Sequence, residues 1–287
     1  MTTTKTSFSQ ALASGRPLLT AECVPPHSGD PEAAKRVLAL LPSSLDAVVV
    51  ADNPDDIHGS ALACAALLAL EGREAVLTMV TRDRNRIALE SDALGASVLG
   101  IGGILCVSGN HQSLGVCAEA ASANDVDSTQ LEQIVKGLGL SGMAIGAVAH
   151  PQQLPIELNL LRLKKKIAAG ADFVLTQPVF DLGAFTRWMD AVRAAGLDQR
   201  AAIIASVLPL AGAEQAELLR QRKIYGPLDE AVVARMSGSS DPGKEGLAMA
   251  VESAAQLKTV PGVRGIHILC GGYEELAGQV IQAAGLA

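Results

Sequence analysis

The sequence predicts an α/β protein whose single domain, residues 1–287, is a (β/α)₈ (TIM) barrel. Short apolar runs alternate along the whole chain with longer segments of helical periodicity, which is the pattern of successive βαβ units. Eight such runs are present, and polar or turn-forming residues gather after them at one end. With 287 residues and 49% apolar composition, the chain is long enough for one large core of this kind.

The predicted strands are runs rich in Val, Ile, Leu and Ala, as expected for parallel strands that are buried on both faces. In chain order they are residues 17–24, 47–50, 75–80, 103–107, 143–148, 173–175, 202–207 and 265–269. An open doubly wound sheet is the alternative. However, the glycines of residues 100–106 precede a predicted strand instead of following one. They therefore do not form a dinucleotide-binding fingerprint, and the closed barrel is favoured.

The predicted helices fill the segments between these strands and are bounded by capping residues. Asp30 precedes the first of them, and Gly170 and Gly196 end two others. They span residues 31–41, 84–94, 156–169, 181–195 and 274–284, and a long segment between strands seven and eight adds extra helices at 229–236 and 243–257. Because no internal repeat or linker interrupts this order, we expect one domain.

The composition argues against several classes of protein. A net charge of −7 and a pI near 5.3 are unsuited to binding nucleic acid or an anionic membrane. No apolar run reaches the roughly 18–20 residues of a bilayer span, and the polar residues 1–9 do not resemble a secretory signal. The five cysteines are widely spaced, so we expect a reduced, cytoplasmic protein. An aromatic content of 2% argues against a site built on aromatic stacking.

Glu22 closes the first predicted strand, and barrel enzymes carry their reactive residues at the C-terminal ends of strands. Its place in an apolar run predicts poor solvation, which raises the pKa of a carboxyl group and suits a general acid. The alternative is a structural carboxylate that accepts hydrogen bonds from backbone amides or pairs with Arg82.

Two amides and two cations also follow predicted strands or lie on a neighbouring helix. Asn110 and Gln177 offer paired donors and acceptors that suit the edge of a planar ring such as a pterin or a flavin, and the alternative is that each amide stabilises its own loop. Arg162 and Lys166 lie four residues apart on one predicted helix face, where they could bind phosphates or face solvent.

The sequence gives little support for a metal site or a hydrolase triad. The candidate ligands near the strand ends have no regular ligand spacing, so we expect no metal. They are His27, His111, His150, Cys23 and Cys106. No G-x-S-x-G sequence marks a serine nucleophile.

Several segments together resemble the methylenetetrahydrofolate reductase family over nearly the whole chain, from about residue 16 to the end. They read AECVPP, TRDRNRIALESDALGASVLGI, LCVSGN, RLKKKIAAGADFVLTQPVFD and LPL. The RDRN sequence after the third strand is similar to that of a short bacterial branch, some of whose members work with a partner subunit.

The resemblance implies a barrel that binds FAD or FMN and reduces 5,10-methylenetetrahydrofolate to 5-methyltetrahydrofolate. Glu22 would be the catalytic acid that protonates the folate and opens its ring to an iminium. Contacts to the folate would fall on Asn110, Gln177 and Gln215. Contacts to the flavin would fall on Asp52, Gly109, Asn159, Arg162 and Lys166.

Four positions depart from the family pattern. Asn110 replaces the aspartate that lies between pterin and flavin, and Val76 replaces a histidine of the third strand. Leu219 replaces a phenylalanine that stacks on nicotinamide and folate, and Tyr273 replaces an arginine that can meet the folate tail. The acid and the glutamine for the pterin are kept, whereas several groups tied to flavin and nicotinamide are not.

Three functional hypotheses follow from this pattern. The first is a flavin-dependent methylenetetrahydrofolate reductase that takes electrons from a partner protein. The second is a flavin-independent methyltransferase that exchanges a methyl group between tetrahydrofolate and a corrinoid protein, because a neutral amide at Asn110 can follow changes in ring protonation. The third is a non-catalytic, folate-binding subunit of a redox complex. In each case we expect a homo-oligomer.

Overall fold

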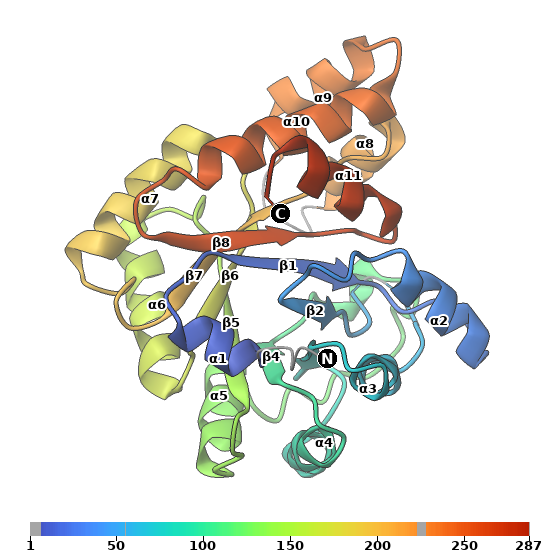
Figure 1. Ribbon diagram of the computed structural model, residues 1–287, viewed down its shortest axis with the longest axis vertical. Helices are drawn as coiled ribbons and strands as arrows, with labels where there is room; N and C mark the ends of the chain where they lie inside the picture. Colours follow the sequence, from blue (N-terminus) through green and yellow to red (C-terminus); the bar gives the residue numbers. More distant parts are fainter. Residues whose placement is uncertain (1–6, 55, 223–227, 287) are drawn as a thin grey trace, which may run out of the picture.

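The computed structural model describes residues 7–54, 56–222 and 228–286 and contains the eight-stranded parallel barrel that the sequence predicts. Neighbouring strands pair in chain order and β1 pairs with β8, so the sheet is closed (Figure 1). The strands are β1 (Leu18–Cys23), β2 (Ala47–Val50), β3 (Ala75–Val80), β4 (Gly103–Val107), β5 (Ala144–Ala149), β6 (Phe173–Pro178), β7 (Ala202–Val207) and β8 (Val263–Ile268). The predicted sixth strand therefore continues to Pro178 and includes Gln177.

Helices cover the outside of the barrel (Figure 1). Those that the sequence predicts are α2 (Pro31–Ala39), α4 (Arg86–Val98), α6 (Ile156–Ala169), α7 (Leu182–Ala194), α9 (Glu230–Gly238), α10 (Pro242–Leu257) and α11 (Glu275–Ala283). The extra helices between β7 and β8 are thus confirmed. Helix α4 begins two residues later than predicted because Asn85 is its N-cap and accepts a hydrogen bond from the Ala88 amide.

The sequence patterns did not predict several further helices. They are α1 (Phe8–Ala13), α3 (Ala61–Leu70), α5 (Ser128–Gly137), α8 (Ala213–Arg222) and the short 3₁₀ helix η1 (Gln112–Leu114). Helix α3 consists only of Ala, Leu and Cys, so no alternation of polar and apolar residues reveals its helical period.

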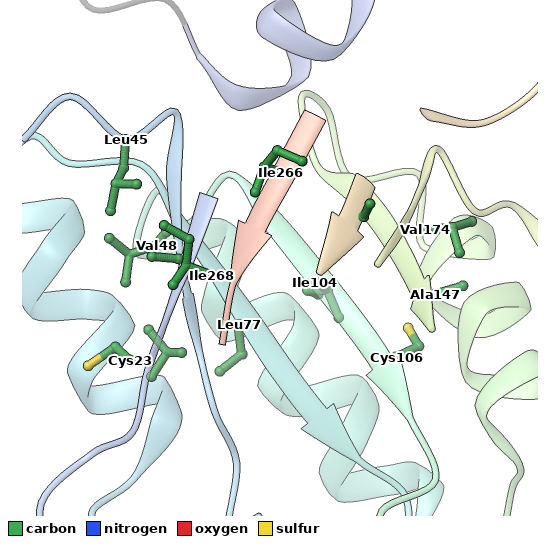
Figure 2. Packing of buried hydrophobic residues seen from close by; sticks show 14 of the residues in the cluster. Cys23, Leu45, Val48, Leu77, Ile104, Cys106, Ala147, Val174, Ile266 and Ile268 are labelled. Carbon is green, nitrogen blue, oxygen red and sulfur yellow. The ribbon is translucent and has the colours of Figure 1, made fainter. Parts of the chain in front are cut away.

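The larger part of the core lies between the strands and the surrounding helices. Outward-facing strand residues such as Val48, Leu77 and Ile104 are buried there against the helices (Figure 2). The barrel interior has its own apolar cluster, which α1 closes at the N-terminal ends of the strands. Phe8 of α1 packs edge-on against Phe173 of β6, with ring centroids 5.2 Å apart. The interior is therefore filled at the N-terminal ends of the strands, so a ligand inside the barrel has to bind at the opposite end.

Candidate functional site

A cavity of about 280 Å³, called the mouth cavity below, opens at the C-terminal ends of the strands. Glu22 from β1, Asn110 after β4 and Gln177 from β6 all line it. The structure thus brings together the acid and the two amides that the sequence analysis assigns to folate. Its volume lies just below the roughly 300–1,000 Å³ typical of small-molecule sites.

The floor of this cavity is polar. His267 of β8 lines it, and its Nδ1 lies 2.9 Å from Thr20 Oγ1. In the strand register His267 pairs with Thr20 on one side and with Ser206 on the other. Burial lowers the pKa of His267 to about 3. The ring is therefore neutral at physiological pH, where it can form hydrogen bonds to a ligand but cannot act as an acid.

Glu22 is held in place by backbone amides. Its side chain is buried, and Oε2 accepts hydrogen bonds from the Cys270 amide at 3.1 Å and the Gly271 amide at 3.0 Å. Arg82 instead forms two hydrogen bonds to Asp83. Of the two structural alternatives for Glu22, the structure shows the amides. These bonds orient the carboxyl group at the edge of the cavity, where a general acid for a bound ring has to lie.

Gln215 lies apart from the other predicted folate residues. It belongs to α8 and lines a second hollow of about 610 Å³, with its Oε1 accepting a hydrogen bond from the Ala211 amide at 2.7 Å. Leu219 and Tyr273, two of the positions that depart from the family pattern, line the same hollow. Glu22 lines both spaces, so the hollow and the cavity meet at the acid.

The residues predicted to bind a flavin fall into two groups. Asp52, Gly109 and Lys166 line the mouth cavity. Asn159 and Arg162 are not among its lining residues, and both contact the loop that precedes α6. Asn159 is buried with its amide donating to the His150 and Gln153 carbonyls, whereas Arg162 is exposed and donates to Gln153 Oε1 at 3.1 Å.

Asp52 is already occupied by protein partners. It is 6% exposed, and its Oδ2 accepts a hydrogen bond from the Val80 amide at 3.0 Å and pairs with Arg84. Burial raises the pKa of Asp52, and the nearby Arg84 guanidinium opposes that rise. Asp52 thus has protein partners already, and two of the five residues that the resemblance assigns to a flavin lie outside the mouth cavity.

Glu132 is a buried acid that the sequence analysis missed. It lies on α5 one turn after Ser128, which lines the cavity, and it is 0% exposed. Within the described part of the chain, neither of its oxygens has a hydrogen-bond partner. Burial raises its pKa to about 8, and the neighbouring Lys166 opposes that rise. The sequence could have revealed this burial, because Glu132 lies on the same helix face as the apolar residues Leu131 and Val135.

Lys166 reaches the cavity wall from α6. Its Nζ donates to the Val148 carbonyl at 2.6 Å, and burial lowers its pKa while Glu132 acts in the opposite direction. The ammonium group is thus held against the end of β5. It is not directed together with Arg162 toward a phosphate.

Replacing Glu132 by methionine is expected to favour the folded state more at pH 8 than at pH 5. A carboxyl group whose pKa is raised on folding binds more protons in the folded state, so it lowers the unfolding free energy as pH rises from about 4.3 toward the folded-state pKa. We expect the change in unfolding free energy to be at least about 1 kcal/mol more favourable at pH 8 than at pH 5. Urea unfolding at both pH values measures it, with Glu119→Met on the exposed loop as the control. An equal gain at both pH values would contradict the assignment.

Two further observations concern other classes of site. Among the residues that the structure describes, no group of three or more His, Cys, Asp or Glu side chains is arranged to hold a metal ion. The same described residues contain no helix with the length and apolar character needed to cross a membrane.

Several proteins with similar sequences are methylenetetrahydrofolate reductases by name. The chain is 37% identical over 68 residues to the 5,10-methylenetetrahydrofolate reductase of Escherichia coli, which covers 24% of this chain and 22% of that protein. It is 26% identical over 166 residues to a probable methylenetetrahydrofolate reductase (NADPH) of Caenorhabditis elegans, covering 56% of this chain and 24% of that protein. The alignments thus span about a quarter of each relative.

Solved structures share the fold. A Clostridium thermocellum protein described as binding two copies of 5-methyl-5,6,7,8-tetrahydrofolic acid superposes with a TM-score of 0.70 over 97% of this chain and 98% of its own, at 11% identity. A 2,3-dimethylmalate lyase superposes with a TM-score of 0.54 at 14% identity, covering 100% of this chain and 87% of its own. Residues 7–285 match the protein family described as methylenetetrahydrofolate reductase, and the chain therefore belongs to that family.

Proposed function

We propose that this chain is an enzyme of one-carbon metabolism that binds a reduced folate with its pterin ring in the mouth cavity. Its reaction in this proposal is the two-electron reduction of 5,10-methylenetetrahydrofolate to 5-methyltetrahydrofolate. The observation that supports it is the convergence of Glu22, Asn110 and Gln177 on one cavity. Membership of the methylenetetrahydrofolate reductase family agrees with this substrate.

Glu22 has a defined task in this reaction. It donates a proton to the nitrogen of the folate side arm, so that the carbon–nitrogen bond to the methylene bridge breaks and an iminium forms on the ring nitrogen. A hydride then adds to the methylene carbon and gives the methyl group. Glu22 is reprotonated from solvent. Because Asn159 and Arg162 lie outside the mouth cavity, we propose that the hydride would come from a hydride carrier, a reduced flavin or nicotinamide, that is held by a partner protein and is oxidised by two electrons.

Gln177 and Asn110 would hold the ring during this step. Both side chains line the cavity with Glu22, and an amide can donate and accept along the edge of a pterin. The neutral His267 on the floor adds one further hydrogen-bonding group.

A second candidate function is methyl transfer between 5-methyltetrahydrofolate and a corrinoid protein. It is favoured by the neutral Asn110 and by the separation of Asn159 and Arg162 from the cavity. In this reaction a cobalt(I) corrinoid provides the electron pair, the nitrogen–methyl bond breaks and a cobalt–methyl bond forms. The ring nitrogen keeps its electron pair and takes a proton.

Turnover assays separate these candidates. The purified chain is incubated anaerobically with 5-methyltetrahydrofolate and either an artificial two-electron acceptor, with and without added FAD or FMN, or cob(I)alamin. Formation of 5,10-methylenetetrahydrofolate supports the reductase, and formation of methylcobalamin supports the methyltransferase. Folate binding without either product would favour the non-catalytic subunit, and absence of binding would contradict all three.

Replacing Gln177 by alanine is expected to raise KM for the folate roughly tenfold, because the ring edge loses hydrogen bonds inside a buried site. The reference is Gln153→Ala, which removes an amide outside the cavity. Steady-state kinetics of both variants tests this expectation. An unchanged KM in Gln177→Ala would remove that residue from the folate site.

A further inference from the structure

Arg82 lies in the loop after β3 and connects several segments at the mouth of the barrel. Its side chain is 11% exposed. Nη1 donates to the Asn110 carbonyl at 2.9 Å, and Nη2 donates to the Asn53 carbonyl at 3.0 Å. Nε and Nη2 also donate to the two carboxylate oxygens of Asp83, at 2.7 and 2.8 Å. Since this two-point contact fixes the plane of the guanidinium group, its remaining donors point at the two carbonyls in a set direction.

The backbone of Arg82 also contacts the connection between β4 and α5, close to the start of α5. Its carbonyl accepts a hydrogen bond from the Ala123 amide at 2.7 Å. The connection between β4 and α5 therefore attaches to Arg82 near both of its ends, at Asn110 and at Ala123. Gly109 shows how closely this connection approaches. It has φ of +78°, and a Cβ there would lie 2.6 Å from Val80 Cγ1 and 3.5 Å from Arg82 Cβ.

The two residues held by the guanidinium group form part of the cavity rim. Asn53 and Asn110 line both the mouth cavity and a neighbouring hollow of about 220 Å³. Arg82 lines the neighbouring hollow but not the mouth cavity. It therefore stands behind the rim, and its charge is matched by Asp83, which leaves it poorly suited to bind an anionic ligand itself.

We propose that Arg82 is a positioning residue that sets the place of Asn110 and Asn53 relative to a ligand in the mouth cavity. Part of this inference rests on the proposed function, because the ligand is taken to be a reduced folate. The hydrogen bonds themselves do not depend on that identity. Arg82 would act on ring binding through Asn110, without touching the ring.

The same segment offers a matched control. Arg86 starts α4, is half exposed, and donates from Nε to Asp125 at 3.3 Å. Neither Arg86 nor Asp125 lines the mouth cavity. Lysine at position 82 or 86 keeps the charge, but one ammonium group cannot reproduce the planar set of donors that joins two carbonyls and a carboxylate.

The first test compares 5-methyltetrahydrofolate binding to the wild type, Arg82→Lys and Arg86→Lys by calorimetry. We expect Arg82→Lys to weaken binding roughly tenfold, as for loss of a charged hydrogen bond, and Arg86→Lys to stay within about twofold. In an Asn110→Ala background, Arg82→Lys should have a smaller effect, since the residue that it positions has been truncated. Equal affinities of the two lysine variants, or full additivity with Asn110→Ala, would overturn the proposal.

The second test needs no ligand. Hydrogen–deuterium exchange should show faster exchange over residues 108–124 in Arg82→Lys than in the wild type or Arg86→Lys. If Arg82→Lys does not fold, Asp83→Asn replaces it, because that change loosens the guanidinium group while keeping the arginine. Unchanged exchange in these variants would contradict the inference. If exchange were faster in Arg82→Lys but the wild type did not bind folate, the result would count against the proposed function alone.

Discussion

Replacing Glu22 by glutamine is expected to lower kcat by roughly 10²–10⁴-fold, the usual contribution of a general acid, in a protein that remains folded. Glutamine preserves the volume of the side chain and can still accept hydrogen bonds from the Cys270 and Gly271 amides. It cannot supply the same proton to the folate. Binding of 5-methyltetrahydrofolate should change far less than turnover, because the interaction lost is one made in the transition state.

Steady-state kinetics and thermal unfolding of the Glu22→Gln protein measure both parts of this prediction. Glu119→Gln, an exposed carboxylate on the loop between β4 and α5, removes the same charge outside the site and should behave as the wild type. Rates in Glu22→Gln equal to those of the control would remove Glu22 from the mechanism. Loss of the fold would instead show that the carboxyl group of Glu22 contributes mainly to stability.

Replacing Asp52 by asparagine is expected to cost about 2–4 kcal/mol of unfolding free energy. Removing one member of a fully buried ion pair costs about 3–5 kcal/mol, because the other charge is left without its partner. The smaller range applies because Arg84 is 25% exposed and keeps Asp92 at 3.1 Å. This cost would be structural, since Asp52 joins the end of β2 to the Val80 amide and to the loop after β3.

Denaturant unfolding of Asp52→Asn, Arg84→Gln and the double variant tests this assignment. The double variant should lose less than the sum of the two single variants, because it leaves no unpaired charge behind. Additive losses would show that the two residues do not act as a pair. If Asp52→Asn had wild-type stability, the residue would be available for a ligand role such as the flavin contact implied by the family resemblance.

The barrel could be predicted from the sequence because its strands are buried on both faces. Such strands are continuous apolar runs, and eight of them separated by helical segments leave few alternative folds. Helix α3 could not be recognised in the same way, since a segment of only Ala, Leu and Cys shows no period. The sixth strand was predicted to end too early, because the polar residues Thr176 and Gln177 interrupt its apolar run. In the structure both residues belong to β6.

The positions of the candidate site residues could be predicted where strand ends alone determine them. Glu22 and Gln177 belong to strands, and Asn110 follows one closely, so closing the barrel brings all three to one mouth. The flavin contacts required more than spacing. Four residues of separation place Arg162 and Lys166 on one helix face, but the neighbours beyond that face decide where each side chain goes. Lys166 reaches Val148, and Arg162 turns to Gln153.

Side chains that connect distant loops were the least predictable part. Arg82 contacts Asn53, Asn110 and Ala123, which are 29, 28 and 41 residues away in the sequence. A conspicuous TRDRN sequence shows that charge is concentrated after β3, but not which carbonyls receive its donors. Such partners follow from the way the loops meet over the closed barrel, and this is known only once the barrel is assembled.

A crystal structure of the chain with 5-methyltetrahydrofolate tests the central claim most directly. We predict that the pterin ring lies in the mouth cavity, with Glu22 and Gln177 both at hydrogen-bond distances of about 2.7–3.2 Å from its polar atoms. A ring bound in the hollow lined by Gln215, Leu219 and Tyr273 with Gln177 out of reach, or at the outer surface, would contradict the claim.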